Sequence, residues 1–182
     1  MQTNIPDKIF LTKGVGVHKE RLASFELALR DAGIAFCNLV HVSSILPPGC
    51  TVLPREKGVA FLRPGQIIFC VMSRIDTNEP NRLMAAAIGM ALPHDSAMYG
   101  YLSEHNAYGE TQDKAGDYAE DIAASMLSST LGAPFNVEDA WDTKKQIWSI
   151  SGKNVTTRNI CQSAEGNKDG LWTTAIAAAI ML

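Results

Sequence analysis

Apolar and polar positions alternate or gather in short runs along most of this chain. These runs predict strands over residues 8–15, 36–42, 66–74 and 98–102. Apolar spacing typical of helices predicts amphipathic helices over 19–32, ended by Gly33, and over 114–131, ended by Gly132. In the first helix, Leu22, Phe25 and Leu29 are expected on one side, with Glu26 beside them.

Other stretches have a less decisive pattern. Residues 81–92 are rich in alanine and fit either a helix or a buried strand, and the apolar run 175–182 fits a buried strand or a short core helix. From Gln146 onward, short strand candidates are separated by Gly152 and by the segment 166–170. Residues 139–167 contain no motif that points to a function.

Many strands and two widely separated helices favour an α+β fold, a layered sandwich, over regular βαβ repetition. The chain has 182 residues, enough for one domain with a sizeable core, and it shows no repeat or linker. We therefore expect a single domain over 1–182.

Composition narrows the possible partners and compartment. The net charge of -3 gives no reason to expect a nucleic acid or an anionic membrane as partner. The first eight residues lack a signal-peptide pattern, and the last apolar run is too short to span a bilayer. Four scattered cysteines predict reduced thiols in the cytoplasm, and four dispersed histidines form no ligand cluster, so we expect no metal.

A pair of serines follows the strand predicted over 36–42. Ser43 and Ser44 precede Pro47 and Pro48, which cannot continue a strand ladder, so the pair lies where a strand gives way to a constrained loop. The ordinary interpretation is a polar strand end whose hydroxyls bond to backbone. The other interpretation is a reactive site, because loops on a rigid scaffold often carry catalytic residues.

The segment around the serines resembles the self-cleavage site of the pyruvoyl-dependent arginine decarboxylases, Asn-Leu-x-x-x-Ser-Ser-Ile-x-Pro-Pro. The matching positions are Asn38, Leu39, Ser43, Ser44, Ile45, Pro47 and Pro48. The resemblance covers most of the chain, from about Ser24 onward, and implies an αββα-type sandwich. It also implies cleavage between Ser43 and Ser44, into a β chain 1–43 and an α chain 44–182, with Asn38 assisting.

The chemistry implied for the serine pair is feasible. The Ser44 hydroxyl would attack the Ser43 carbonyl and convert the amide to an ester. Elimination of that ester leaves dehydroalanine, which hydrolyses to a pyruvoyl ketone and ammonia. A donor aimed at the developing oxyanion would help, as would backbone strain. Asn38 is a candidate donor, although it could equally be a strand asparagine that pairs with backbone.

A pyruvoyl group would serve as the electron sink for decarboxylation, through a Schiff base with the substrate amine. No phosphate-cradling loop with a partnered lysine is evident, and the pair Gly14 and Gly16 is more typical of a turn. The resemblance makes Glu104 the acid that protonates the carbanion. His105 is the rival donor, because histidine titrates near neutrality.

The family places an aspartate in the first helix to hold the substrate guanidinium, and Glu26 occupies that position here, one methylene longer. Asp31 is the fallback. The resemblance implies conversion of L-arginine to agmatine and carbon dioxide, for polyamine synthesis or acid resistance, by a homotrimer or a multiple of it. Two alternatives stay open: another basic amino acid as substrate (histidine, ornithine or lysine), or an unprocessed small-molecule binding or assembly protein of the same fold.

Overall fold

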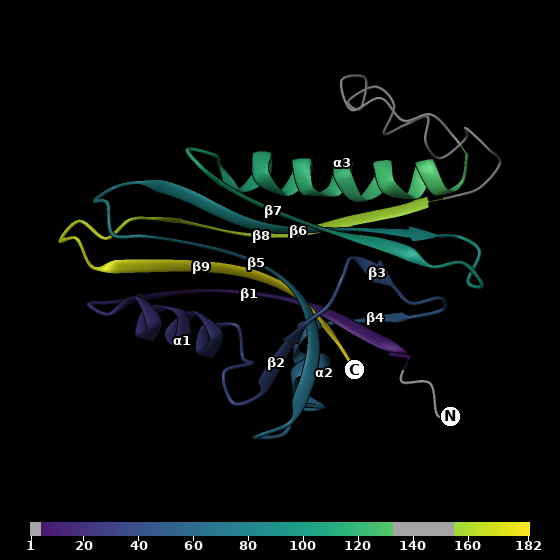
Figure 1. Ribbon diagram of the computed structural model, residues 1–182, viewed down its shortest axis with the longest axis horizontal. Helices are drawn as coiled ribbons and strands as arrows, with labels where there is room; N and C mark the ends of the chain where they lie inside the picture. Colours follow the sequence, from purple (N-terminus) through teal and green to yellow (C-terminus); the bar gives the residue numbers. More distant parts are fainter. Residues whose placement is uncertain (1–4, 133–154) are drawn as a thin grey trace.

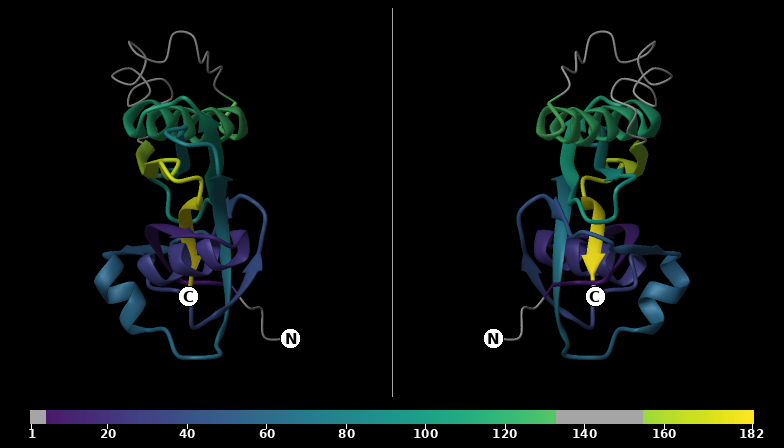
Figure 2. Two further views of the ribbon diagram at one scale, coloured as in Figure 1. Left: turned by 90° about the vertical axis from the view of Figure 1, so that its left-hand side faces the viewer. Right: turned by 90° about the vertical axis from the view of Figure 1, so that its right-hand side faces the viewer.

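The computed structural model describes residues 5–132 and 155–182. Within these residues the chain forms four layers: helices α1 and α2, a five-stranded sheet, a four-stranded sheet and helix α3 (Figure 1, Figure 2). The elements in chain order are β1 (Lys8–His18), α1 (Arg21–Asp31), β2 (Asn38–His41), β3 (Ile45–Leu46), β4 (Thr51–Leu53), α2 (Arg55–Ala60), β5 (Ile67–Thr77), β6 (Leu83–Pro93), β7 (Gly100–Tyr108), α3 (Gln112–Thr130), β8 (Val155–Glu165) and β9 (Trp172–Met181). The predicted α+β sandwich in a single domain is confirmed.

The two sheets differ in topology. The five-stranded sheet has the order β2-β5-β9-β1-β4, and its two outer pairs are parallel while its central pairs are antiparallel. The four-stranded sheet has the order β3-β7-β6-β8 and is antiparallel throughout. Consecutive strands β2 and β3 are therefore edge strands of different sheets.

Alternation along the strands builds the core between the layers. Along β9, Ile176 and Ile180 pack toward α1, while Ala177 and Ala179 pack against the four-stranded sheet. That second contact, which also includes Ile88 and Leu102, fills the space between the two sheets.

The two alanine-rich stretches are both strands, β6 and β9. Alanine is uncommon in strands, but these strands are covered on both faces at short range. A Cβ atom on Gly89 of β6 would lie 2.0 Å from the Ala119 carbonyl oxygen of α3. Small residues are what so close an approach of helix and sheet requires.

Helix α1 buries only part of the face that its apolar residues predict: Phe25 and Leu29 pack, partly buried, against the core, but Leu22 does not. Leu22 is 77% exposed, and the buried residues are Ser24 and Ala28. The reason lies in Gly14 and Gly16, which are within β1 and not in the turn that the sequence suggested. A Cβ atom at either glycine would lie 2.2 Å from a carbonyl oxygen of α1, so the helix rests with its small residues directly on the strand.

Two further expectations change. The apolar run that predicts a strand over 36–42 would suit a buried strand, but it forms the short β2, which is largely exposed in the protomer and is an edge strand with one neighbour, β5. Strand β7 runs to Tyr108, past the expected end at residue 102. Trp141, Trp148 and the strand candidates between residues 146 and 154 lie outside the described residues.

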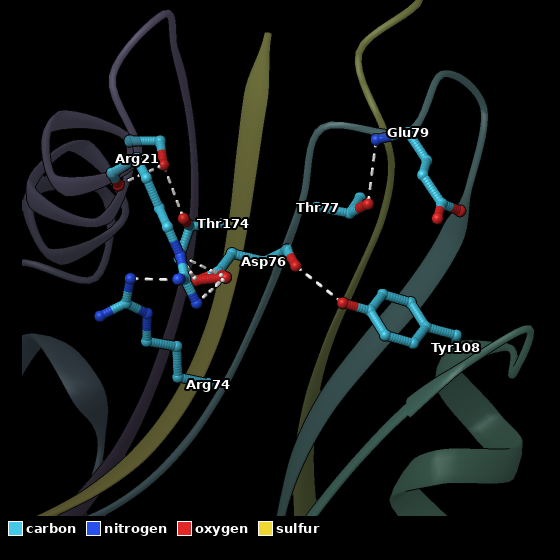
Figure 3. Close-up of polar contacts among 8 residues, drawn as sticks. Arg21, Arg74, Asp76, Thr77, Glu79, Tyr108 and Thr174 are labelled. Atoms are coloured by element: carbon cyan, nitrogen blue, oxygen red, sulfur yellow. Dashed lines mark hydrogen bonds and ion pairs between the residues drawn. The ribbon is translucent and has the colours of Figure 1, made fainter. Parts of the chain in front are cut away.

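A polar cluster ties α1 and β7 to β5 (Figure 3). The side chains of Arg21 and Arg74 both point to the Asp76 carboxylate, with closest N–O distances of 2.6 and 3.0 Å. The Tyr108 hydroxyl donates to the Asp76 carbonyl oxygen at 2.7 Å, and the hydroxyls of Ser24 and Thr174 share a hydrogen bond. Burial disfavours the charge on Asp76, but the two arginines outweigh it and lower its pKa.

Within the part of the chain that the structure describes, no helix is both long enough and apolar enough to cross a membrane.

Candidate active site

The Ser43–Ser44 peptide bond lies where the chain crosses from one sheet to the other. Before it, the Val42 N–H donates to the Cys70 carbonyl of β5 at 3.0 Å. After it, the Ser44 carbonyl accepts from the Leu102 N–H of β7 at 2.8 Å. The bond between the two serines is thus held from both sides, by β5 of one sheet and by β7 of the other.

A mainly apolar cavity opens beside this bond. Its volume is about 400 Å³, within the range of small-molecule sites. The lining comes from the N-terminal segment, the crossing and the ends of β5 and β9: Ile5, Pro6, Val42, Ser43, Ile45, Pro47, Pro48, Phe69 and Met181. Ser43 is the polar side chain of this lining, so the cavity can hold an aliphatic chain next to the serine pair.

Glu104 lies in β7, two residues from the amide that binds the Ser44 carbonyl. Its side chain is exposed in the single protomer, but partial desolvation of the carboxyl group by the atoms around it raises its pKa, and the nearby charge of His41 works in the opposite direction. The charge on Glu104 in turn contributes, after burial, to a raised pKa of Cys70. These couplings place the carboxyl group at the side of the sandwich where β2 and β5 meet β7, and its raised pKa favours the protonated form.

His105 points the other way. Successive side chains of a strand face opposite sides, and the ring of His105 packs against Tyr118 of α3 with centroids 4.5 Å apart. Its Nε2 atom lies 2.8 Å from the Glu110 carboxylate. The rival proton donor therefore faces the α3 layer, away from the space between the sheets that Glu104 borders.

Asn38 begins β2, at the opposite end of the strand from the serines. Its side-chain amide donates to the Gly65 carbonyl at 3.1 Å. Strand β2 spans Asn38–His41 and the Val42 N–H continues its pairing with β5, so four residues at roughly 3.3 Å each separate Asn38 from Val42 by about 13 Å. Within one protomer, the Asn38 amide and the Ser43 carbonyl are not brought together.

Glu26 lies beside the segment that leads into β2, and it does not line the cavity at the serines. It borders a second cavity, of about 440 Å³, together with Arg30, Gly33, Ala35 and Phe36. Its carboxylate forms an ion pair with Arg30 of the next helical turn at 2.5 Å. Asp31, the fallback, is tied to β1, because its carboxylate accepts the Val15 N–H at 2.9 Å.

The candidate residues thus form two groups at the two ends of β2. We call Ser43, Ser44 and Glu104 the serine end, and Asn38 and Glu26 the glutamate end. The cavities at the two ends share no lining residue.

Comparison with known proteins identifies the family of this chain. The family model for pyruvoyl-dependent arginine decarboxylase matches residues 8–182. The chain is 60% identical over 180 residues to a probable pyruvoyl-dependent arginine decarboxylase of Chloroherpeton thalassium, covering 99% of both chains. It is also 58% identical over 178 residues to pyruvoyl-dependent arginine decarboxylase 2 of Methanosarcina mazei, covering 98% of this chain and 97% of the relative.

The chain belongs to the pyruvoyl-dependent arginine decarboxylase family. The match begins at residue 8, so the family resemblance extends further toward the N-terminus than the expected start near Ser24. The matched region includes β1, whose glycines allow α1, the helix that carries Glu26, to pack closely against the sheet.

Family membership directs attention to the serine pair, and the structure adds groups there that the sequence analysis did not single out. These are the backbone amides of Val42, Ile45 and Leu102, together with the His41 side chain near Glu104. A backbone N–H exists at every residue except proline, so residue type carries no signal that could have identified these amides.

Proposed function

We propose that this chain is a self-processing pyruvoyl-dependent decarboxylase that converts L-arginine to agmatine and carbon dioxide. The observation that carries the proposal is the position of the Ser43–Ser44 bond, where the chain passes from one sheet to the other. In a member of this family, that bond is hydrogen-bonded to both sheets on its two sides, and it lies beside an apolar cavity and a glutamate with a raised pKa. In this proposal the bond is cut to give fragments 1–43 and 44–182, and Ser44 becomes the pyruvoyl group.

The surroundings of Ser44 fit such a group. Its carbonyl is held by the Leu102 amide at 2.8 Å, and the same amide would hold it after cleavage because it belongs to β7. Fragment 1–43 would stay bound, since β1 pairs with β9 over ten residues and β2 pairs with β5. When formed, the pyruvoyl group supplies the carbonyl that captures the substrate amine and withdraws electrons as carbon dioxide leaves.

Glu104 is proposed as the acid that returns a proton to the substrate carbon. That task requires a carboxyl group that is protonated near neutral pH, and burial shifts Glu104 in this direction. Its neighbour His105 faces α3 and is already bonded to Glu110.

Glu26 is proposed to bind the guanidinium group and Asn38 to assist cleavage, each acting on a neighbouring protomer. Both lie at the glutamate end of β2, so they complete a site only if a second chain brings its serine end there. The ion pair with Arg30 shows that the Glu26 carboxylate already accepts a guanidinium of its own chain. A substrate guanidinium would replace that partner.

The surface around β2 supports assembly through this region. Apolar side chains that are exposed in the protomer follow β2 from end to end: Phe36, Val40, Ile45 and Ile67. We call them the β2 apolar patch. Such a patch marks an interaction surface, and a head-to-tail contact that closes on itself gives a ring. We propose a homotrimer, or a multiple of it, and a native mass of one protomer or of two would contradict this.

The first experiment is intact mass under denaturing conditions, with S44A as the uncut control. We expect wild-type protein to give fragments 1–43 and 44–182, the larger one carrying a pyruvoyl group in place of Ser44. Arginine turnover is then followed by agmatine and carbon dioxide release, with lysine, ornithine and histidine as competing substrates. An uncut wild-type chain would refute the mechanism, and faster turnover of another basic amino acid would refute the substrate.

We also propose the cytoplasm as the compartment, because all four cysteines are free thiols and such thiols persist in reducing surroundings.

A further inference from the structure

We propose that the backbone N–H of Ile45 is the oxyanion donor for self-cleavage of the Ser43–Ser44 bond. This inference rests on the proposed cleavage site. It goes beyond that proposal by assigning a group that touches the reacting carbonyl within the same chain.

The donor already points at the reacting atom. The Ile45 N–H donates to the Ser43 carbonyl oxygen at 3.0 Å. A bond between residues i and i+2 closes a γ-turn with Ser44 at its centre. Asn81 is the one non-glycine residue with a positive φ in the part of the chain that is described, so Ser44 has a negative φ and the turn is the inverse type, the unstrained one.

The strand ladder leaves this N–H available. Ile45 pairs with Tyr101 in the antiparallel contact between β3 and β7. Because the Leu102 N–H bonds to the Ser44 carbonyl, the Ile45–Tyr101 pair is of the kind that exchanges no hydrogen bonds with each other. The Ile45 amide is therefore directed away from β7 and back to Ser43.

The chemistry gives this hydrogen bond a function. When the Ser44 Oγ atom bonds to the Ser43 carbonyl carbon, the electron pair of the C=O double bond moves to the oxygen. The N–H of Ile45 would stabilise that charge from the distance typical of oxyanion donors. The hydroxyl gives up its proton as the Oγ–C bond forms. Collapse of the adduct restores the C=O double bond and breaks the C–N bond, the Ser44 nitrogen takes up the proton that the hydroxyl lost, and the ester forms. In the same protomer the Asn38 amide is held by Gly65 at the other end of β2.

The test is substitution of Ile45 by proline, which removes the N–H and takes no bond from the ladder. Proline also pushes the preceding residue out of the γ-turn geometry. We expect I45P to cleave about 10²–10³-fold more slowly than wild type, the cost of losing one oxyanion donor. Cleavage is followed by intact mass from the time of synthesis, and I45V, which keeps the N–H, should cleave at the wild-type rate.

Two controls separate the possible failures. The S44A protein, which cannot be cut, serves as the reference for folding. I45P counts as folded when its thermal melting point and native mass match those of S44A. Because proline also disturbs the conformation of Ser44, an α-hydroxy acid is placed at position 45 as well, which replaces the N–H by oxygen, and it is compared with the amide of the same side chain; it should cleave more slowly than that amide. Cleavage of folded I45P or of the ester variant at the rate of its control would overturn the inference. If wild type itself stays uncut, the cleavage proposal fails instead.

Discussion

The two ends of β2 present different kinds of site. At the serine end, the chain is tied by backbone hydrogen bonds to β5 and β7, and the Ile45 N–H donates to the Ser43 carbonyl of the bond proposed to be cut. At the glutamate end, the functional side chains are occupied by partners within the protomer, Glu26 by Arg30 and Asn38 by Gly65. The serine end is thus prepared for chemistry in one protomer, whereas the glutamate end needs a ligand or a second chain to displace those partners.

The comparison predicts the largest effect for the proton donor at the serine end. E104Q should lower turnover by about 10²–10⁴-fold, the usual contribution of a general acid, while leaving self-cleavage intact. Agmatine release and intact mass measure the two activities separately. H105Q, on the opposite face of β7, is the matched control and should retain turnover. Equal losses of turnover in E104Q and H105Q would contradict the assignment of Glu104, and not His105, as the proton donor.

Asn38 allows a direct test of whether the two ends meet between protomers. N38A alone should cleave about 10²–10³-fold more slowly, if its amide is a second oxyanion donor. When N38A and S44A chains are assembled together, the intact Asn38 of the S44A chain should restore cleavage of the N38A chain. Mass spectrometry distinguishes the two chains. N38A chains that stay uncut in mixed assemblies would place Asn38 within its own protomer's site.

Glu26 should affect substrate binding and not cleavage. Loss of a charge-assisted hydrogen bond of about 1.5–3 kcal/mol should raise KM for arginine in E26Q by roughly ten- to a hundredfold. Steady-state kinetics gives KM, and intact mass should show complete processing. D31N, whose position is tied to β1, serves as the control with unchanged KM. An unchanged KM in E26Q would remove Glu26 from the substrate site.

The pH dependence of turnover should report Glu104. Its folded pKa is raised, chiefly by burial, so the carboxyl stays protonated to higher pH than an ordinary glutamate. Turnover should therefore fall as the pH rises through this raised pKa. A profile of kcat against pH should show this descending limb in wild type and lack it in the residual activity of E104Q. The same limb in both variants would assign it to another group.

The smallest effect is expected at the ion pair between Arg21 and Asp76, which joins α1, the helix that carries Glu26, to β5. D76N should destabilise the protein by about 2 kcal/mol at neutral pH, because it removes charge-assisted bonds from Arg21 and Arg74. The folded pKa of Asp76 is lowered, so its stabilisation is present above the unfolded value of about 3.9 and is lost as the pH falls through the folded pKa. Thermal melting of both proteins should converge in acid. Melting points that differ equally at all pH values would exclude this linkage.

Several elements were accessible from the sequence because their signals are local. Gly33 and Gly132 mark helix ends, and the motif around Ser43 and Ser44 identified the family from its residue types and spacing. The alanine-rich stretches could not be assigned in advance, since alanine suits a helix and also suits a strand covered closely on both faces. Only the layers packed on each stretch decide between these: α3 lies against Gly89 of β6, and β9 is covered by α1 and by the four-stranded sheet.

The prediction that Leu22 faces the core was wrong for a related reason. Phe25 and Leu29 do pack against the core, but the glycines of β1 bring the α1 backbone so close that the residues directly on the strand are the small Ser24 and Ala28. That information lies in another element of the chain.

Local residue patterns therefore determined the fold class, the family and the identity of the serine pair. The tertiary structure decided which sheet edge holds each side of the Ser43–Ser44 bond, which face of β7 carries Glu104, and that Asn38 and Glu26 lie at the far end of β2. The physical reason is that these relations depend on hydrogen bonds and packing between segments far apart in the chain. Residue type in any one segment does not encode them.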